Sequence, residues 1–214
     1  MKHPDEVNTL FNRLRQSAKA KPVSAIEKII QDGPDRDLCR INALAFAAKH
    51  KLDEEDVIAA LLHGARLGIF DMSWNIVCPA CSGVLDSGAT LKTVKAAEYT
   101  CVLCADACEP TLDEIVEVTF TISPRVRKIA AHDPGALPWI DYYRQVFWSS
   151  GIDLPDDETL AKWVKETTLD ARELLPGEKA VLSFQLPEGY MIVFDPVLHM
   201  SQHIEVKGEP VRES

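Results

Sequence analysis

Two cysteine pairs in the middle of the chain constrain its fold more than any other feature. The 214 residues include six cysteines, four of which form the pairs Cys78-Pro-Ala-Cys81 and Cys101-Val-Leu-Cys104. Each pair can present two thiolates to one ion from a single tight turn, and two such turns supply the four sulfurs of a tetrahedral structural zinc site. We therefore predict a structural Zn²⁺ ion bound by Cys78, Cys81, Cys101 and Cys104, with no coordination position left open for catalysis.

Other uses of four thiols are buried apolar side chains, disulfides and a rubredoxin-like iron site. Two pairs in one short stretch disfavour the first use. The N-terminus, Met-Lys-His-Pro-Asp-Glu, lacks the apolar segment of a signal peptide, so we expect a cytoplasmic, reducing compartment that disfavours disulfides. Iron stays open, although the second pair is followed by Ala105-Asp106 without the usual knuckle glycine. Cys39 and Cys108 lie outside the arrangement, and we expect packed or surface thiols there.

The composition is that of a globular protein with a net negative charge. Hydrophobic residues make up 46% of the chain, which is enough for a core, and no apolar run approaches the ~20 residues that cross a bilayer. The 33 acidic and 23 basic side chains give a net charge of −10. Because this charge repels a polyanion, the composition disfavours nucleic acid as a partner.

The first third of the chain has a helical pattern. Ser24-Ala-Ile-Glu27 matches a capping box and Gly33-Pro34 is a stop signal, which predicts a helical lead-in over residues 1–34. Apolar residues at i, i+3, i+4 and i+7 then predict two short helices joined by a turn at 51–53, followed by a strand over 72–77. The apolar positions are Ile41, Leu44, Ala45, Ala48, Ile58, Leu61, Leu62 and Ala65. We assign residues 35–76 to a helix-turn-helix, winged-helix-like unit and residues 77–109 to a four-cysteine zinc ribbon.

The sequence has two candidate sites for nucleic acid or another anion, and they carry charges of opposite sign. The second helix of the pair opens with Asp53, Glu54, Glu55 and Asp56, at the end that would face DNA phosphates, so a packed helical module is favoured over a DNA reader. A basic cluster of Arg125, Arg127 and Lys128 is either an anion or partner contact or a solvated loop face.

Residues 110–214 are expected to form a mixed α+β region with a charged tail. Val116, Val118, Phe120 and Ile122 alternate as in a half-buried strand. Pro138 opens an aromatic-rich helix whose stripe we interpret as core packing rather than a ligand cage. Further patterns predict a helix over 157–174, strands over 180–186 and 204–206, and a buried strand over 190–194. The fold class is therefore α+β.

Motifs of common enzymes are not recognisable in the sequence. We find no Gly-rich phosphate loop, G-x-S-x-G elbow or H-E-x-x-H helix. His132-Asp133 lacks an assignable nucleophile and is equally explained as a turn before a proline. His199 and His203 lie in a segment of loop and strand, where helical ligand spacing does not apply. We expect a protein without catalytic activity.

Several stretches resemble an uncharacterised bacterial domain family found upstream of class III adenylate/guanylate cyclase catalytic domains. They lie between about Pro34 and Pro210. The stretches are Arg40-Ile-Asn-Ala-Leu-Ala-Phe-Ala-Ala, Gly68-Ile-Phe-Asp-Met-Ser-Trp-Asn-Ile-Val-Cys-Pro-Ala-Cys, Tyr99-Thr-Cys-Val-Leu-Cys, Glu109-Pro-Thr-Leu-Asp-Glu-Ile-Val-Glu-Val-Thr-Phe-Thr and Asp195-Pro-Val. The resemblance implies a non-catalytic accessory module whose cysteine pairs match the family's. The chain lacks the metal-binding aspartate motifs of the cyclase domain, so cyclase activity is not implied.

These observations lead to three functional hypotheses. The first is a zinc-containing regulatory or protein-interaction module in cyclic-nucleotide signalling, whose partner is a cyclase domain in cis or in trans; a homo-oligomer is left open. The second is a winged-helix/zinc-ribbon transcription regulator that binds DNA. The third is a thiol-redox sensor that uses Cys39, Cys108 or release of the metal.

Overall fold

The computed structural model describes residues 4–90, 99–101, 103–104, 107–108, 115–172, 174–195 and 200–207. The chain divides into two compact units, Met1–Asp153 and Leu154–Ser214, which are described separately. Helices and antiparallel strands are both present, which confirms the α+β class. No helix in the described ranges is long and apolar enough to cross a membrane.

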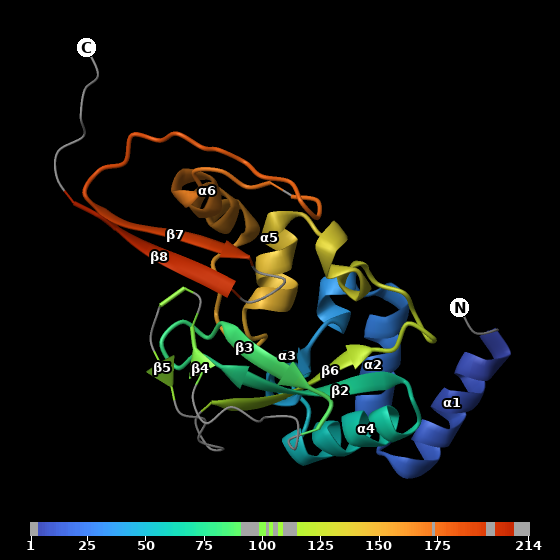
Figure 1. The fold of residues 1–214 in the computed structure, drawn as a ribbon. Helices are drawn as coiled ribbons and strands as arrows, with labels where there is room; N and C mark the ends of the chain where they lie inside the picture. Colours follow the sequence, from blue (N-terminus) through green and yellow to red (C-terminus); the bar gives the residue numbers. More distant parts are fainter. Residues whose placement is uncertain are drawn as a thin grey trace. The chain divides into compact units, whose positions relative to one another are not determined.

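Helices make up most of the first 66 residues (Figure 1). They are α1 (Pro4–Ser17), α2 (Ala20–Asp32), the 3-10 turn η1 (Asp35–Leu38), α3 (Ala43–His50) and α4 (Glu54–Arg66). The predicted helix pair is confirmed: the Asn42 side chain caps α3, Lys51 ends it in the left-handed conformation, and the Asp53 side chain caps α4. The capping-box motif at Ser24 does not mark a helix start, since Ser24 lies inside α2, which begins at Ala20.

The buried face of α4 is rotated from the predicted one. Val57, Ala60, Leu61 and Gly64 are buried, whereas Ile58 and Leu62 of the predicted stripe are exposed. Apolar residues occupy more than one side of α4, so periodicity alone does not select the buried side. Close packing does: a Cβ on Gly64 would lie 2.9 Å from the ring of Phe70.

A four-stranded antiparallel sheet lies beside these helices (Figure 1). The strands are β1 (Ile41–Asn42), β6 (Val116–Ile122), β2 (Phe70–Val77) and β3 (Val84–Gly88), in the order β1-β6-β2-β3. Because β6 pairs with both β1 and β2, one sheet joins residues that the sequence divided at 76 and 109. The only division between compact units lies at Asp153, so the ribbon region is part of the first unit.

The first unit ends with an aromatic helix. After 3-10 turns η3 (Ala130–His132) and η4 (Pro134–Ala136), α5 (Trp139–Tyr142) continues as the π-helical turn η5 (Tyr143–Phe147). Tyr142, Phe147 and Trp148 are buried, and the rings of Tyr143 and Trp148 lie 5.2 Å apart. Of the predicted stripe, Tyr142 is buried, Tyr143 and Val146 are partly buried and Trp139 is exposed, so the stripe packs in the interior only in part.

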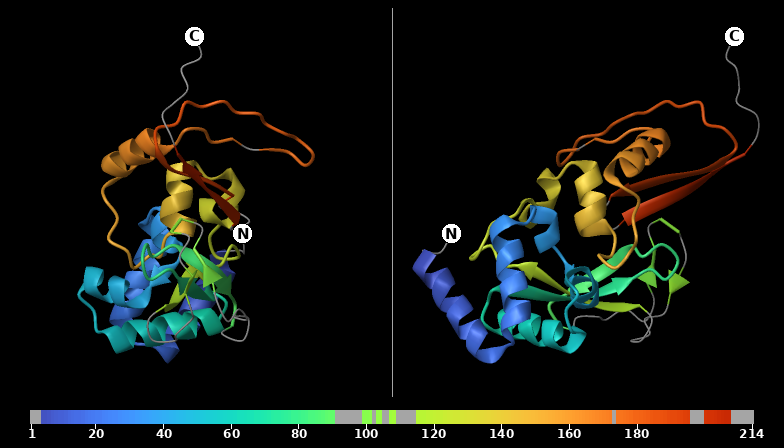
Figure 2. Two further views of the ribbon diagram at one scale, coloured as in Figure 1. Left: turned by 60° about the vertical axis from the view of Figure 1, so that its left-hand side comes forward. Right: turned by 180° about the vertical axis from the view of Figure 1, so that it is seen from behind.

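The second unit contains helix α6 (Asp157–Thr167) and a hairpin of β7 (Gly189–Asp195) and β8 (Met200–Val206), drawn in orange and red in Figure 2. The helix is shorter than predicted, and residues 180–186 are not a strand. β7 forms as expected but is not buried, since Tyr190 and Val193 are exposed. Among its described large apolar side chains, Leu160 is the buried one.

Candidate metal centre

The first cysteine pair lies in the turn of the β2–β3 hairpin. β2 ends at Val77 and β3 begins at Val84. Two backbone hydrogen bonds close the turn between them: Cys78 N–H donates to the Gly83 carbonyl and Ser82 N–H donates to the Cys78 carbonyl, each at 2.8 Å. Val77 N–H also donates to the Ile115 carbonyl at 2.8 Å. The turn is thus fixed to the central sheet on both sides.

Backbone groups of this turn also face the ligand sulfurs. Burial alone raises the pKa of Cys78, but the N–H groups of Cys81 and Ala80 offset it, and the net pKa lies below that of an ordinary thiol. The Gly83 N–H similarly faces the Cys81 sulfur. Such N–H groups stabilise a thiolate, which is the form that binds a metal ion. The chain makes this turn with Ser82 in the left-handed conformation, at φ 57°.

The second pair lies in the turn of a much smaller hairpin. Its strands are β4 (Tyr99–Thr100) and β5 (Ala107–Cys108), paired antiparallel with Tyr99 opposite Cys108. Cys101 directly follows β4. The Tyr99 hydroxyl donates to Asp86 Oδ2 of β3 at 3.0 Å. This bond links the two hairpins.

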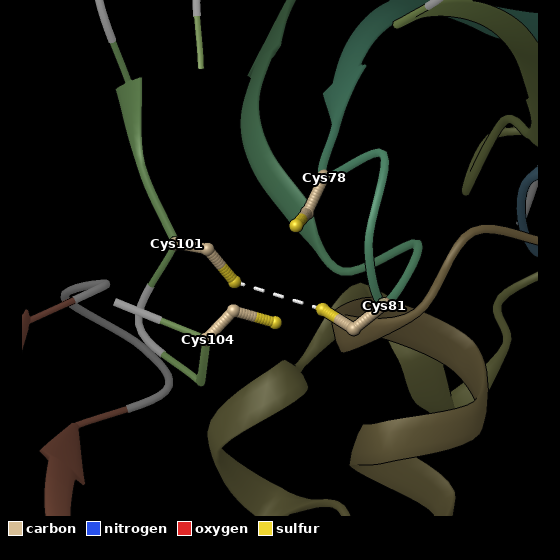
Figure 3. Close-up of side chains that lie close together, drawn as sticks. All are labelled: Cys78, Cys81, Cys101 and Cys104. Carbon is tan, nitrogen blue, oxygen red and sulfur yellow. Dashed lines mark hydrogen bonds between the residues drawn. The ribbon is translucent and has the colours of Figure 1, made fainter. Parts of the chain in front are cut away.

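The two turns bring all four predicted ligands together (Figure 3). The sulfurs of Cys78, Cys81, Cys101 and Cys104 lie within 4.8 Å of one another and point toward a common centre. The Cys81 and Cys101 sulfurs are 3.6 Å apart, close to the ~3.8 Å edge of a tetrahedron with metal–sulfur bonds of about 2.3 Å. A disulfide needs about 2.05 Å. The arrangement can hold a metal ion.

Burial divides the four ligands into two kinds. Cys78 and Cys101 are each 1% exposed, whereas Cys81 and Cys104 are partly exposed. Burial also raises the pKa of Cys81, and raises that of Cys104 to about 11. Four ionised sulfurs this close would repel one another strongly. A bound cation removes that repulsion, so metal binding would be accompanied by release of thiol protons.

One residue of the predicted basic cluster, Arg127, has structural partners within the fold. Arg127 donates to the Ile30 carbonyl and to Asp35 Oδ1, each at 2.8 Å, and so joins the segment after β6 to α2 and η1. Arg125 and Lys128 are exposed. The guanidinium of Arg127 therefore has a structural partner, and two exposed basic side chains are left of the three.

His132 and Cys39, which were also considered from the sequence, have ordinary packing roles. His132 accepts a hydrogen bond from Ile129 N–H at 3.1 Å, and its Nε2 lies 2.8 Å from the Ile122 carbonyl. The Cys39 thiol donates to the Gln145 carbonyl at 3.2 Å, and burial raises its pKa. His203 is exposed. His199 and the side chain of Cys108 lie outside the described residues.

Contacts from the aromatic helix to the first turn were not anticipated from sequence. Gly83 forms an antiparallel bridge with Trp148, and Ser149 N–H donates to the Ser82 carbonyl at 2.9 Å. No local motif predicts a contact between segments so far apart in the chain. The glycine two positions after Cys81 was the one available signal, because glycine permits close approach of another chain segment.

Comparison with known protein families places the chain. A family described as a family of unknown function, DUF5939, matches residues 4–214. No curated protein and no solved structure matches the chain. Because the match covers nearly all of the sequence, the chain belongs to the DUF5939 family.

Proposed function

We propose that Cys78, Cys81, Cys101 and Cys104 bind one Zn²⁺ ion that has a structural role. The observation that carries the proposal is the convergence of their four sulfurs within 4.8 Å from two separate hairpin turns. Four thiolates complete the tetrahedral coordination of zinc and leave no position for water or substrate. Zinc has no redox chemistry at such a site, so its contribution is to hold the two turns together.

Elemental analysis tests the metal and its identity. The expected result is one zinc per chain in colourless protein, and loss of that zinc in a Cys101→Ala variant. A Cys39→Ala variant is the matched control, because Cys39 bonds to Gln145 and lies outside the cluster, and it should keep its zinc. Coloured, iron-loaded protein from zinc-replete and iron-limited cells would contradict the assignment, since iron takes the same ligands.

The role that we assign to the protein is that of a non-catalytic regulatory or protein-interaction module in cyclic-nucleotide signalling. Its support is the resemblance of the stretches between Pro34 and Pro210 to domains that precede class III cyclase catalytic domains. The test is co-purification of the full reading frame with each cyclase domain encoded in the same genome. Capture of one such domain is the expected result, and failure with all of them contradicts the assignment.

The structure gives less support to the two alternative hypotheses. Asp53 caps α4 and Glu54 and Glu55 are exposed in its first turn, so the helix end that would meet DNA carries negative charge. Fluorescence anisotropy at low salt should therefore detect no binding of duplex DNA. Cys39 is a poor redox sensor because its raised pKa keeps it in the unreactive thiol form.

A further inference from the structure

The segment that follows the aromatic helix packs directly on the first cysteine turn. Trp148 pairs with Gly83, and the Ser149 amide donates to the Ser82 carbonyl at 2.9 Å. Trp148 N–H in turn donates to the Tyr143 carbonyl at 3.0 Å. The backbone of the metal-binding turn is thereby hydrogen-bonded to the segment that follows η5.

Side chains make this contact tight. A Cβ placed on Gly83 would lie 3.2 Å from the Phe147 ring and 3.3 Å from the Cys81 sulfur. The ring, the glycine and the ligand sulfur therefore leave no free space between them. Phe147 is 1% exposed, so its ring cannot move away without displacing other buried groups.

The same segment belongs to a connected group of rings. The Phe147 ring lies 5.6 Å from Tyr143 and 5.7 Å from Trp148. Because neighbouring rings in a packed interior move together, a shift at Phe147 would affect the end of the aromatic helix as a whole. Trp148 and Ser149 are also among the last buried residues before the first unit ends at Asp153.

We propose that metal binding at the four cysteines clamps the segment Phe147–Ser149, so that metal occupancy controls the order of the chain that leaves the first unit. The inference rests on the proposed metal site and adds that the segment Phe147–Ser149 responds to metal binding. Coordination fixes the Cys81 side chain and the turn 78–83, and the turn then holds Trp148 and Ser149. Coupling of this kind is reciprocal, so a disturbed clamp weakens metal binding by the same factor by which metal strengthens the clamp.

Hydrogen exchange of the full chain tests the clamp without any substitution. The amides of Trp148 and Ser149 should exchange about tenfold more slowly in protein loaded with Zn²⁺ than in protein stripped with a chelator. Amides in the middle of α2 serve as the internal control and should not change. Stoichiometric zinc with equal exchange at Trp148 and Ser149 in both states would overturn the clamp alone. Failure to bind any metal would overturn the proposed site and the clamp with it.

A pair of glycine variants tests the reciprocal effect. Gly83→Ala inserts a methyl group between the Phe147 ring and the Cys81 sulfur, whereas Gly135→Ala meets no atom within 4 Å. We expect Gly83→Ala to weaken zinc binding about tenfold in a chelator competition and Gly135→Ala to bind as the unmodified protein does. Wild-type affinity together with wild-type protection of Ser149 in Gly83→Ala would contradict the proposal. Circular dichroism checks that both variants fold. If Gly83→Ala does not fold, the hydrogen-exchange experiment on the unsubstituted protein tests the clamp by itself.

Discussion

The two halves of the metal centre are built very differently. The first cysteine turn joins strands of the central sheet, is closed by its own hydrogen bonds and packs on Trp148 and Ser149. The second turn joins β4 and β5, which have two residues each, and is linked to the first hairpin by side-chain contacts such as the bond from Tyr99 to Asp86. A two-stranded hairpin of this size is not stable alone. The comparison indicates that the strands of the first hairpin form without the metal, whereas the second hairpin depends on it, and that the metal adds order to the first turn and to the segment that it clamps.

Removal of the metal should have the largest effect and should separate the two halves. At a free Zn²⁺ concentration of about 1,000 times the Kd, bound metal contributes about 4 kcal/mol to the free energy of unfolding. After chelation, we expect the amides of β4 and β5 to lose their protection while those of β2 and β6 keep it. Amide-resolved hydrogen exchange measures both. Simultaneous loss of protection in all four strands would show that the central sheet also depends on the metal for its folding.

Cysteine substitutions in the two turns should differ when compared in the absence of metal. Cys78→Ala removes a side chain that is 1% exposed beside the sheet, so it should lower the free energy of unfolding of the metal-free protein by about 1–2 kcal/mol. Cys104→Ala, in the second turn, should change it by less than about 0.5 kcal/mol. Urea denaturation with a chelator present gives both values. Equal losses would contradict a first hairpin that folds without the metal and a second hairpin that needs it.

The bond between the hairpins gives a smaller expected effect. Tyr99→Phe removes the hydroxyl that donates to Asp86 and should cost about 1 kcal/mol in the zinc-loaded protein. The cost should fall toward zero after chelation, because the second hairpin is then no longer held in place. Tyr190→Phe, at a tyrosine that is 78% exposed in the second unit, is the control. An equal cost of Tyr99→Phe with and without metal would show that the second hairpin is also preformed.

The smallest expected effect is a gain of stability in the first turn. Ser82 has a φ of 57°, a conformation that is unfavourable for a residue with a Cβ and open to glycine. Ser82→Gly should therefore raise the thermal midpoint slightly, by an amount that corresponds to at most about 1 kcal/mol. Ser150→Gly, at a described position without positive φ, should not stabilise. Destabilisation by Ser82→Gly would mean that its side chain has a role that no described contact shows.

Sequence patterns predicted the parts of this protein that depend on local signals. Cysteine spacing identified the four ligands, and alternation in 116–122 matched the bounds of β6. The same alternation in 180–186 predicted a strand that does not form. Alternation indicates which face of a strand is buried, but it does not supply a neighbouring strand for pairing. In the described part of the chain, no strand pairs with these residues. The contact of Gly83 with Trp148 was missed for the opposite reason, because only the tertiary fold brings the two together.

The joint binding of one metal ion by both turns is the central claim, and X-ray absorption at the zinc edge tests it most directly. The account predicts four sulfur neighbours at about 2.3 Å around each zinc, and the loss of this signal when either Cys78 or Cys104 is replaced by alanine. Fewer than four sulfur neighbours, or oxygen and nitrogen atoms in their place, would contradict the assignment of Cys78, Cys81, Cys101 and Cys104 as a closed structural site.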